Sequence, residues 1–175
     1  MFIIPVEDFY LLAILNSKLI WAYLKRVCSV LGDEDKGGRL ELRSIYMKDV
    51  PIAQTDNKEP LATRAETMLD ENKRLQALKS QFLQLLQTQV DLPAVSRKLE
   101  DWPGLSFKDF VAELTKQKVK LSLSQQSEWM QFLTEQQAKA HTIQTILDQT
   151  EREINQLVYQ LYGLTDAEIA VVEGR

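Results

Sequence analysis

Residues 60–90 read PLATRAETMLDENKRLQALKSQFLQLLQTQV, and this segment is the most informative about the fold. Proline suits the first turn of a helix. Behind it, apolar or small residues recur alternately every four and three positions, at Leu61, Ala65, Met68, Leu75, Phe82 and Leu86. Asn72 and Lys79 interrupt this stripe. Alternation of three and four is the pattern of a coiled-coil seam, so the stretch predicts one long helix with a helical partner.

A second stripe with the same spacing lies nearer the C-terminus, at Leu133, Ala140, Ile143, Leu147, Ile154, Leu157 and Leu161. The segment between the stripes is long enough to reverse the chain, which favours an antiparallel coiled-coil hairpin. Within that segment Trp102-Pro103-Gly104 predicts a turn, and Ser106 predicts the N-cap of a short helix. We expect Trp102, Phe107 and Phe110 to pack a small helical cap.

The chain ends with signals for one further short helix. Gly163 is placed to end the second long helix, because glycine readily takes the left-handed conformation that follows a helix. Thr165 and Glu168 have the spacing of a capping box. We therefore expect a last helix to begin just after Thr165.

The first 58 residues differ in kind from the rest. An apolar run from Asp8 to about Val30 predicts one helix, capped by Asp8 and ended by Gly32. Residues 39–43, RLELR, alternate with a period of two, which predicts a strand. Its basic and acidic side chains would share one face and its leucines the core face. Pro51 then predicts an edge strand or an extended exit over residues 50–53.

These patterns together predict a mainly α protein of α+β type. Residues 1–58 would form a small mixed helix–strand lobe. Residues 59–175 would form a long antiparallel coiled-coil hairpin with a small helical cap, acting as a spacer or arm.

Composition limits the chemistry that this chain performs. The net charge of −4 argues against binding nucleic acid by overall charge. The single cysteine, Cys28, suits a buried thiol, and the single histidine, His141, falls on a predicted helix with no partner for catalysis. We expect no catalytic, metal-binding or cofactor-binding residue. No signal peptide or membrane-spanning segment is expected, which favours a cytoplasmic location.

Basic residues nevertheless gather in the first part of the chain. Six of them fall within 24 residues: Lys25, Arg26, Lys36, Arg39, Arg43 and Lys48. Arginine makes bidentate contacts to guanine or phosphate, so this cluster is a candidate DNA-binding surface. An ordinary solvated hairpin is the alternative that these residues leave open.

Several segments resemble one known family. They are residues 12–21 (LAILNSKLIW), 37–42 (GGRLEL), 46–52 (YMKDVPI), 153–165 (EINQLVYQLYGLT) and 168–174 (EIAVVEG). The first three resemble the closing portion of the TaqI-like specificity domain of type IIG restriction-modification enzymes. The last two resemble the C-terminal end of many such enzymes, which fuse an endonuclease, an N6-adenine DNA methyltransferase and a target-recognition domain.

The resemblance implies that this chain is the C-terminal part of such an enzyme, with double-stranded DNA as its partner. The methyltransferase and endonuclease domains, with S-adenosylmethionine and Mg²⁺, would belong to a missing N-terminal portion, because the Pro-Pro pair of the methyltransferase motif does not occur here. An alternative is a protein-interaction arm without DNA contact, since residues 59–175 hold thirteen basic and seventeen acidic residues. Self-association through that arm is also left open.

Overall fold

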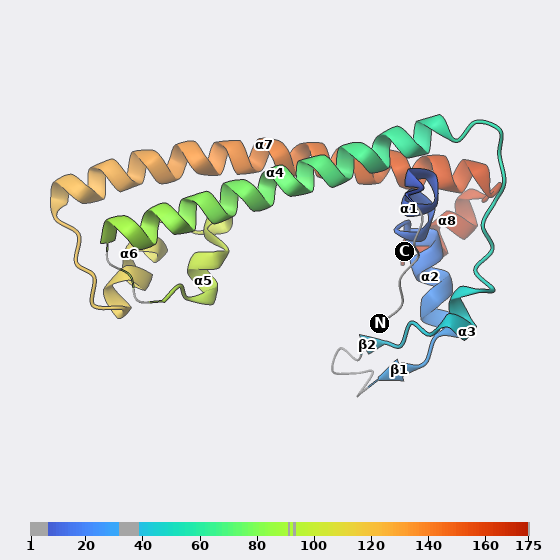
Figure 1. The fold of residues 1–175 in the computed structure, drawn as a ribbon, viewed down its shortest axis with the longest axis horizontal. Coiled ribbons are helices and arrows are strands. Elements are labelled where there is room, and N and C mark those ends of the chain that lie inside the picture. The colour runs from blue at the N-terminus through green and yellow to red at the C-terminus, as the bar shows by residue number, and fades with distance from the viewer. Residues whose placement is uncertain (1–6, 32–38, 91, 93, 175) are drawn as a thin grey trace. The chain divides into compact units, whose positions relative to one another are not determined.

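The computed structural model describes residues 7–31, 39–90, 92 and 94–174. The protein is mainly helical, which confirms the predicted fold class (Figure 1). Its elements in chain order are α1 (Phe9–Leu15), α2 (Lys18–Val27), β1 (Val30–Leu31), β2 (Arg39–Leu40), α3 (Ser44–Met47), α4 (Glu59–Val90), α5 (Arg97–Glu100), the 3-10 helix η2 (Trp102–Gly104), α6 (Phe107–Lys116), α7 (Leu123–Leu161) and α8 (Asp166–Val172).

The chain packs as two compact units. Unit 1 comprises residues 1–68 and 149–175, and unit 2 comprises residues 69–148. The sequence predicted a boundary between two domains after residue 58, where the polar linker gives way to the long helix. The units divide the chain differently, because the first turns of α4 and the last turns of α7 pack with the N-terminal segments.

The predicted N-terminal helix is in fact two helices. The Asp8 carboxylate accepts from the Leu11 N–H (3.0 Å), which confirms the predicted N-cap of α1. The single helix is wrong because Ser17, fully buried, interrupts it. The Ser17 hydroxyl donates to the Ile14 carbonyl (2.7 Å) and accepts from the Ile20 N–H (3.4 Å), closing α1 and capping α2. Gly32, the predicted stop, lies outside the described residues.

The core of unit 1 joins these helices to the ends of the two long helices. Its buried side chains are Tyr10, Ala13, Ile14, Ile20, Leu24, Cys28, Val50, Leu61, Ala65, Ile154 and Val158. Asn155, also buried, accepts the Lys18 N–H at the start of α2 (2.8 Å). A side chain far away in the sequence thus satisfies a free N–H group of a helix terminus.

Two tyrosines bind the extended segment that Pro51 predicted over residues 50–53. The Tyr162 hydroxyl donates to the Pro51 carbonyl (2.6 Å) and accepts from the Ala53 N–H (3.1 Å). The Tyr10 hydroxyl donates to the Ala53 carbonyl (2.6 Å). Side chains take the place of a neighbouring strand, so this segment is extended without being part of a sheet.

The predicted strand over residues 39–43 is correct only at its start. β1 and β2 pair antiparallel, with Val30 opposite Leu40 and Leu31 opposite Arg39. Beyond Leu40 the prediction is wrong, because the Arg43 N–H bonds the Glu41 carbonyl (3.0 Å) and the chain turns into α3. Leu42, predicted for the core face, is 45% exposed.

In unit 2, α4 and α7 lie side by side and antiparallel, as the two stripes predicted (Figure 1). Their shared core includes Phe82 and Leu86 from α4 and Leu133 and Ala140 from α7. Ile143 and Leu147 are also buried, whereas Leu75 is half-buried. The coiled-coil stripes therefore mark the packed faces of the long helices, as they do for Leu61, Ala65 and Ile154 in unit 1.

The predicted cap is confirmed as α5, η2 and α6. Trp102 is fully buried and stacks on Phe82 with ring centroids 4.2 Å apart. Phe110 is also fully buried and meets Phe82 edge-on at 6.3 Å. The Gln137 side-chain amide donates to the Trp102 carbonyl (3.0 Å) and the Leu105 carbonyl (2.7 Å), so α7 also satisfies the backbone of the cap. Ser106 caps α6 as predicted.

The C-terminal signals are confirmed as well. Gly163 follows α7 with a φ of +66°. Thr165 and Glu168 form the capping box of α8, with both reciprocal bonds present.

Candidate nucleic-acid interface in unit 1

The described basic residues of the candidate surface all belong to unit 1 and are all exposed. Lys25 and Arg26 occupy the last turn of α2, and Arg39 lies on β2. Arg43 and Lys48 flank α3 as its N-cap and C-cap residues. Lys36, the sixth predicted residue, lies outside the described residues.

Hydrogen bonds around Ser29 tie together the segments that carry these basic residues. The Ser29 carbonyl accepts the Glu41 N–H (2.8 Å), and the Ser29 and Tyr46 hydroxyls are hydrogen-bonded (2.7 Å). The Tyr23 hydroxyl of α2 donates to the Asp49 carbonyl (3.2 Å). These bonds hold the end of α2, the chain after β2 and the end of α3 in one local substructure.

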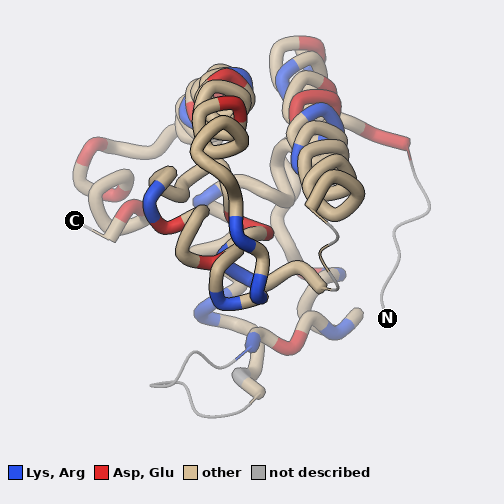
Figure 2. The backbone as a smooth tube through the Cα atoms, turned by 90° about the vertical axis from the view of Figure 1, so that its left-hand side faces the viewer, with Lys and Arg blue, Asp and Glu red and all other residues tan. Residues whose placement is uncertain are grey.

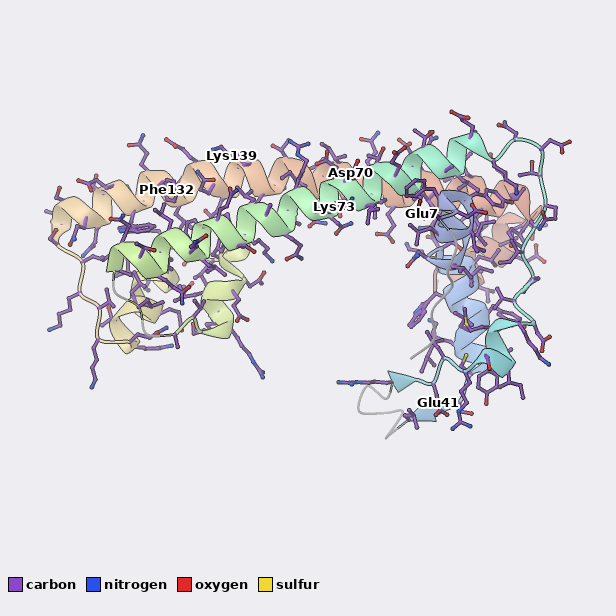
Figure 3. All side chains as sticks on the ribbon, viewed as in Figure 1. Glu7, Glu41, Asp70, Lys73, Phe132 and Lys139 are labelled. Carbon is purple, nitrogen blue, oxygen red and sulfur yellow. The ribbon has the colours of Figure 1, made fainter. Side chains whose placement is uncertain are left out.

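Arg43 is engaged differently from its neighbours. Its guanidinium donates to the Glu41 carboxylate (2.7 Å), and this hydrogen bond raises the pKa of Arg43 above its usual value. Because β2 ends at Leu40, Arg39 and Arg43 do not share a strand face. Arg43 must give up or share its Glu41 contact to bind another group. Figure 3 labels Glu41 beside the short strands.

The other basic residues are available for a ligand. Within the described part of the chain, Lys25, Arg26, Arg39 and Lys48 have no ion pair or side-chain hydrogen bond. Along the long helices, Lys and Arg are interspersed with Asp and Glu (Figure 2). Lys73 pairs with Asp70 at 3.2 Å (Figure 3). Lys25, Arg26, Arg39 and Lys48 are thus less neutralised than Lys73 of α4.

Sequence reasoning missed one residue of this surface, Trp21 on α2. Its side chain is 48% exposed, although tryptophan is usually well buried. Lys18 and Lys25, three residues before it and four after it, are also exposed. The spacing of these three residues along one helix face could have indicated that Trp21 is exposed. The apolar residues of the rest of the segment instead predicted a helix that is buried on more than one side.

The described residues show no other chemical centre. No group of three or more His, Cys, Asp or Glu side chains among them could hold a metal ion. Cys28 is buried, which raises the pKa of its thiol and makes it less reactive. His141 is exposed on α7. None of the described helices combines the length and apolar character needed to cross a membrane.

A family model, "Domain of unknown function (DUF8810)", matches residues 54–158. The match covers more than half of the chain. The chain belongs to the DUF8810 family. The DUF8810 match begins in the linker before α4 and ends within the last turn of α7. It therefore covers the long helices and their cap, and it leaves out α1 to α3, where the candidate interface lies. No curated protein and no solved structure matches the chain.

Proposed function

We propose that unit 1 is the DNA-contacting part of a sequence-recognition module of the type IIG restriction-modification kind. The observation that carries this proposal is the set of exposed cations without an ion pair in the described residues, Lys25, Arg26, Arg39 and Lys48. Double-stranded DNA is the proposed partner, because its phosphates attract such a set even on a protein of net negative charge.

The basic residues have different proposed roles. Lys25 and Lys48 suit phosphate contacts, because an ammonium group is a point charge that does not distinguish bases. Arg39 lies on a two-residue strand that is narrow enough to enter a major groove, and its guanidinium can bind guanine through two hydrogen bonds. Arg39 is therefore the candidate for reading sequence.

The catalytic steps are assigned to other domains in this proposal. A methyltransferase using S-adenosylmethionine and an endonuclease using Mg²⁺ would act on the DNA that unit 1 positions. The DUF8810 region would support the N-terminal part of unit 1, since α4 and α7 each contribute residues to the core of unit 1.

Equilibrium binding to a random-sequence DNA duplex over a range of salt concentrations tests the proposal. We expect Lys48→Ala to weaken binding to all sequences and to reduce the magnitude of the negative slope of log K against log salt by about 0.9 for each lost phosphate contact. Arg39→Ala should weaken binding too, and it should also relax the sequence specificity of the chain, measured by selecting bound duplexes from the random-sequence mixture. Lys73→Ala, which changes an ion-paired lysine of α4, is the matched control and should leave both properties unchanged.

Two outcomes would contradict the proposal. One is that the wild-type chain shows no measurable duplex binding at low salt. The other is that the Arg39 and Lys48 variants bind DNA as tightly as the Lys73 variant does.

A second candidate function is a protein-interaction arm without DNA contact. It is supported by exposed apolar side chains on the long helices of unit 2, with Leu123 85% exposed and Met130 50% exposed. Nearby, Leu85, Trp129 and Phe132 line an open groove. Sedimentation of the chain with a candidate methyltransferase partner tests this function: association that Leu123→Glu abolishes would support it. Sedimentation of the chain alone would reveal self-association.

A further inference from the structure

One face of α2 carries an exposed aromatic ring between two lysines. At 3.6 residues per turn, Lys18, Trp21 and Lys25 fall within about 60° of the helix circumference. All three are exposed, whereas Ile20 and Leu24 bind the helix to the core of unit 1. We name the exposed set the α2 stripe.

We infer that the α2 stripe binds an unpaired nucleotide of a DNA strand, with the base stacked on the Trp21 indole. The inference rests on the proposed DNA function and adds the state of the strand that is bound. An indole ring stacks on the flat face of a base, and in a duplex the neighbouring bases cover that face. Trp21 therefore fits a base that is single-stranded, bulged or flipped out.

The charges beside Trp21 suit the phosphates of the same strand. With a rise of 1.5 Å per residue, Lys18 and Lys25 are about 10 Å apart along the helix, one on each side of the ring. Lys25 has no ion pair within the described residues. Lys18 lies 4.0 Å from the Glu173 carboxylate, and its side chain is 46% exposed, so water and a phosphate can reach it.

The α2 stripe also continues the proposed duplex surface, because Lys25 belongs to both. The stripe itself offers an aromatic face and two point charges, with no amide or guanidinium to read the edge of a base. We therefore expect binding that tolerates any base, with stacking supplying affinity and not sequence choice.

Binding of three labelled DNAs tests the inference: a single-stranded oligonucleotide, the matching duplex, and the same duplex with an unpaired bulge. We expect Trp21→Ala to weaken binding to the single strand and to the bulged duplex by about tenfold. Binding to the perfect duplex should change by less than about twofold, since its bases stay stacked on each other. Trp21→Phe should keep most of the affinity, because a smaller aromatic ring still stacks.

Val171→Ala is the matched control, since Val171 is an exposed apolar residue of α8, 61% exposed, outside the α2 stripe. It should bind all three DNAs as the wild type does. Circular dichroism of each variant separates loss of binding from loss of folding. Tryptophan fluorescence adds an independent readout, because single-stranded DNA should quench the wild type more than Trp21→Phe.

The outcomes distinguish this inference from the function on which it rests. If Trp21→Ala binds single-stranded and bulged DNA as the wild type does, the α2 stripe is not a stacking site. Duplex binding that depends on Arg39 and Lys48 would then still support the proposed function. Absence of duplex binding by the wild type contradicts the proposed function, whatever Trp21 does.

Discussion

Lys118 has a backbone conformation that side chains rarely adopt, with a φ of +66°. It follows α6, where the Lys118 N–H bonds the Thr115 carbonyl (3.0 Å) and the Val119 N–H bonds the Leu114 carbonyl (3.0 Å). This is the bonding pattern of a Schellman motif, whose left-handed position is usually glycine. The same pattern follows α7, where glycine does occupy the position, at Gly163.

We expect Lys118→Gly to raise the free energy of unfolding by about 0.5–1 kcal/mol, because glycine takes a positive φ without steric strain. Urea denaturation of the two proteins measures the difference. Gly163→Ala is the converse variant and should lower stability by about 1 kcal/mol. A Cβ at Gly163 meets no atom within 4 Å, so that loss reports the backbone alone. A destabilised Lys118→Gly variant would show that the Lys118 side chain stabilises the fold by more than its backbone strain destabilises it.

Glu113 makes stability depend on pH in unit 2. Its carboxylate accepts from the Lys116 ammonium (2.7 Å) and the Ser96 hydroxyl (3.1 Å). The Lys116 hydrogen bond, the largest cause, and the Ser96 bond lower the pKa of Glu113 below its usual 4.5. A lowered folded-state pKa means that the carboxylate stabilises the fold above about pH 4.5, and that this stabilisation is lost as the pH falls through the folded-state value.

We therefore expect Glu113→Gln to unfold at a lower urea concentration than the wild type near neutral pH. The gap between the two midpoints should shrink as the pH drops below 4.5, where the wild-type carboxyl also becomes neutral. Glu100→Gln, an exposed change on α5, serves as the control. A gap that stays constant with pH would show that charge is not the cause.

At the scale of elements, the helix boundaries depend on short polar side chains. Ser17 closes α1 and caps α2, and it is fully buried. Replacing it with alanine leaves the Ile14 carbonyl and the Ile20 N–H without those hydrogen bonds. We expect Ser17→Ala to lower the free energy of unfolding by about 1–2 kcal/mol, as measured by chemical denaturation. Ser44→Ala, an exposed change in α3, should have little effect. Equal effects of the two variants would contradict the role of Ser17.

Local patterns predicted most elements, and the two failures have separate causes. Asp8, Ser106 and Thr165 act on backbone groups within three residues, so their caps follow from the sequence. The apolar residues on both sides of Ser17 hid the break between α1 and α2. The strand at Arg39 ended early because the Arg43 N–H bonds the Glu41 carbonyl and the chain then turns into α3.

The candidate interface was predicted only in part. Residue type and spacing predicted a basic cluster, and the exposure of its described members is consistent with that cluster. The ion pair between Arg43 and Glu41 and the exposure of Trp21 depend on how the chain packs. DNA binding itself stays a prediction.

At the scale of the whole molecule, the two units have separate hydrophobic cores. No residue in the described core of unit 1 belongs to the described core of unit 2. Phe82 is central in unit 2, where its ring meets those of Trp102, Phe110, Trp129 and Phe132. Because their cores are separate, each unit can unfold locally with its own free energy of unfolding.

We expect Phe82→Ala to destabilise unit 2 by about 3–5 kcal/mol, through the cavity that it leaves among the aromatic rings. Amide hydrogen exchange measures this change residue by residue. Protection should fall at Leu99 and Phe110 and stay near the wild-type value at Ile14 and Leu24. An equal loss of protection in both units would show that they unfold as one.

The long paired helices, the cap at their connection and most helix termini could be predicted from the amino-acid sequence, because these depend on periodicity and on contacts between residues a few positions apart. Which side chains remain exposed, and which polar groups bond to residues distant in the sequence, became clear from the three-dimensional packing. Asn155 reaches the Lys18 N–H across 137 positions, and Tyr162 holds residues 51–53 in place of a strand. Such contacts depend on the packing of distant segments, which no local pattern encodes.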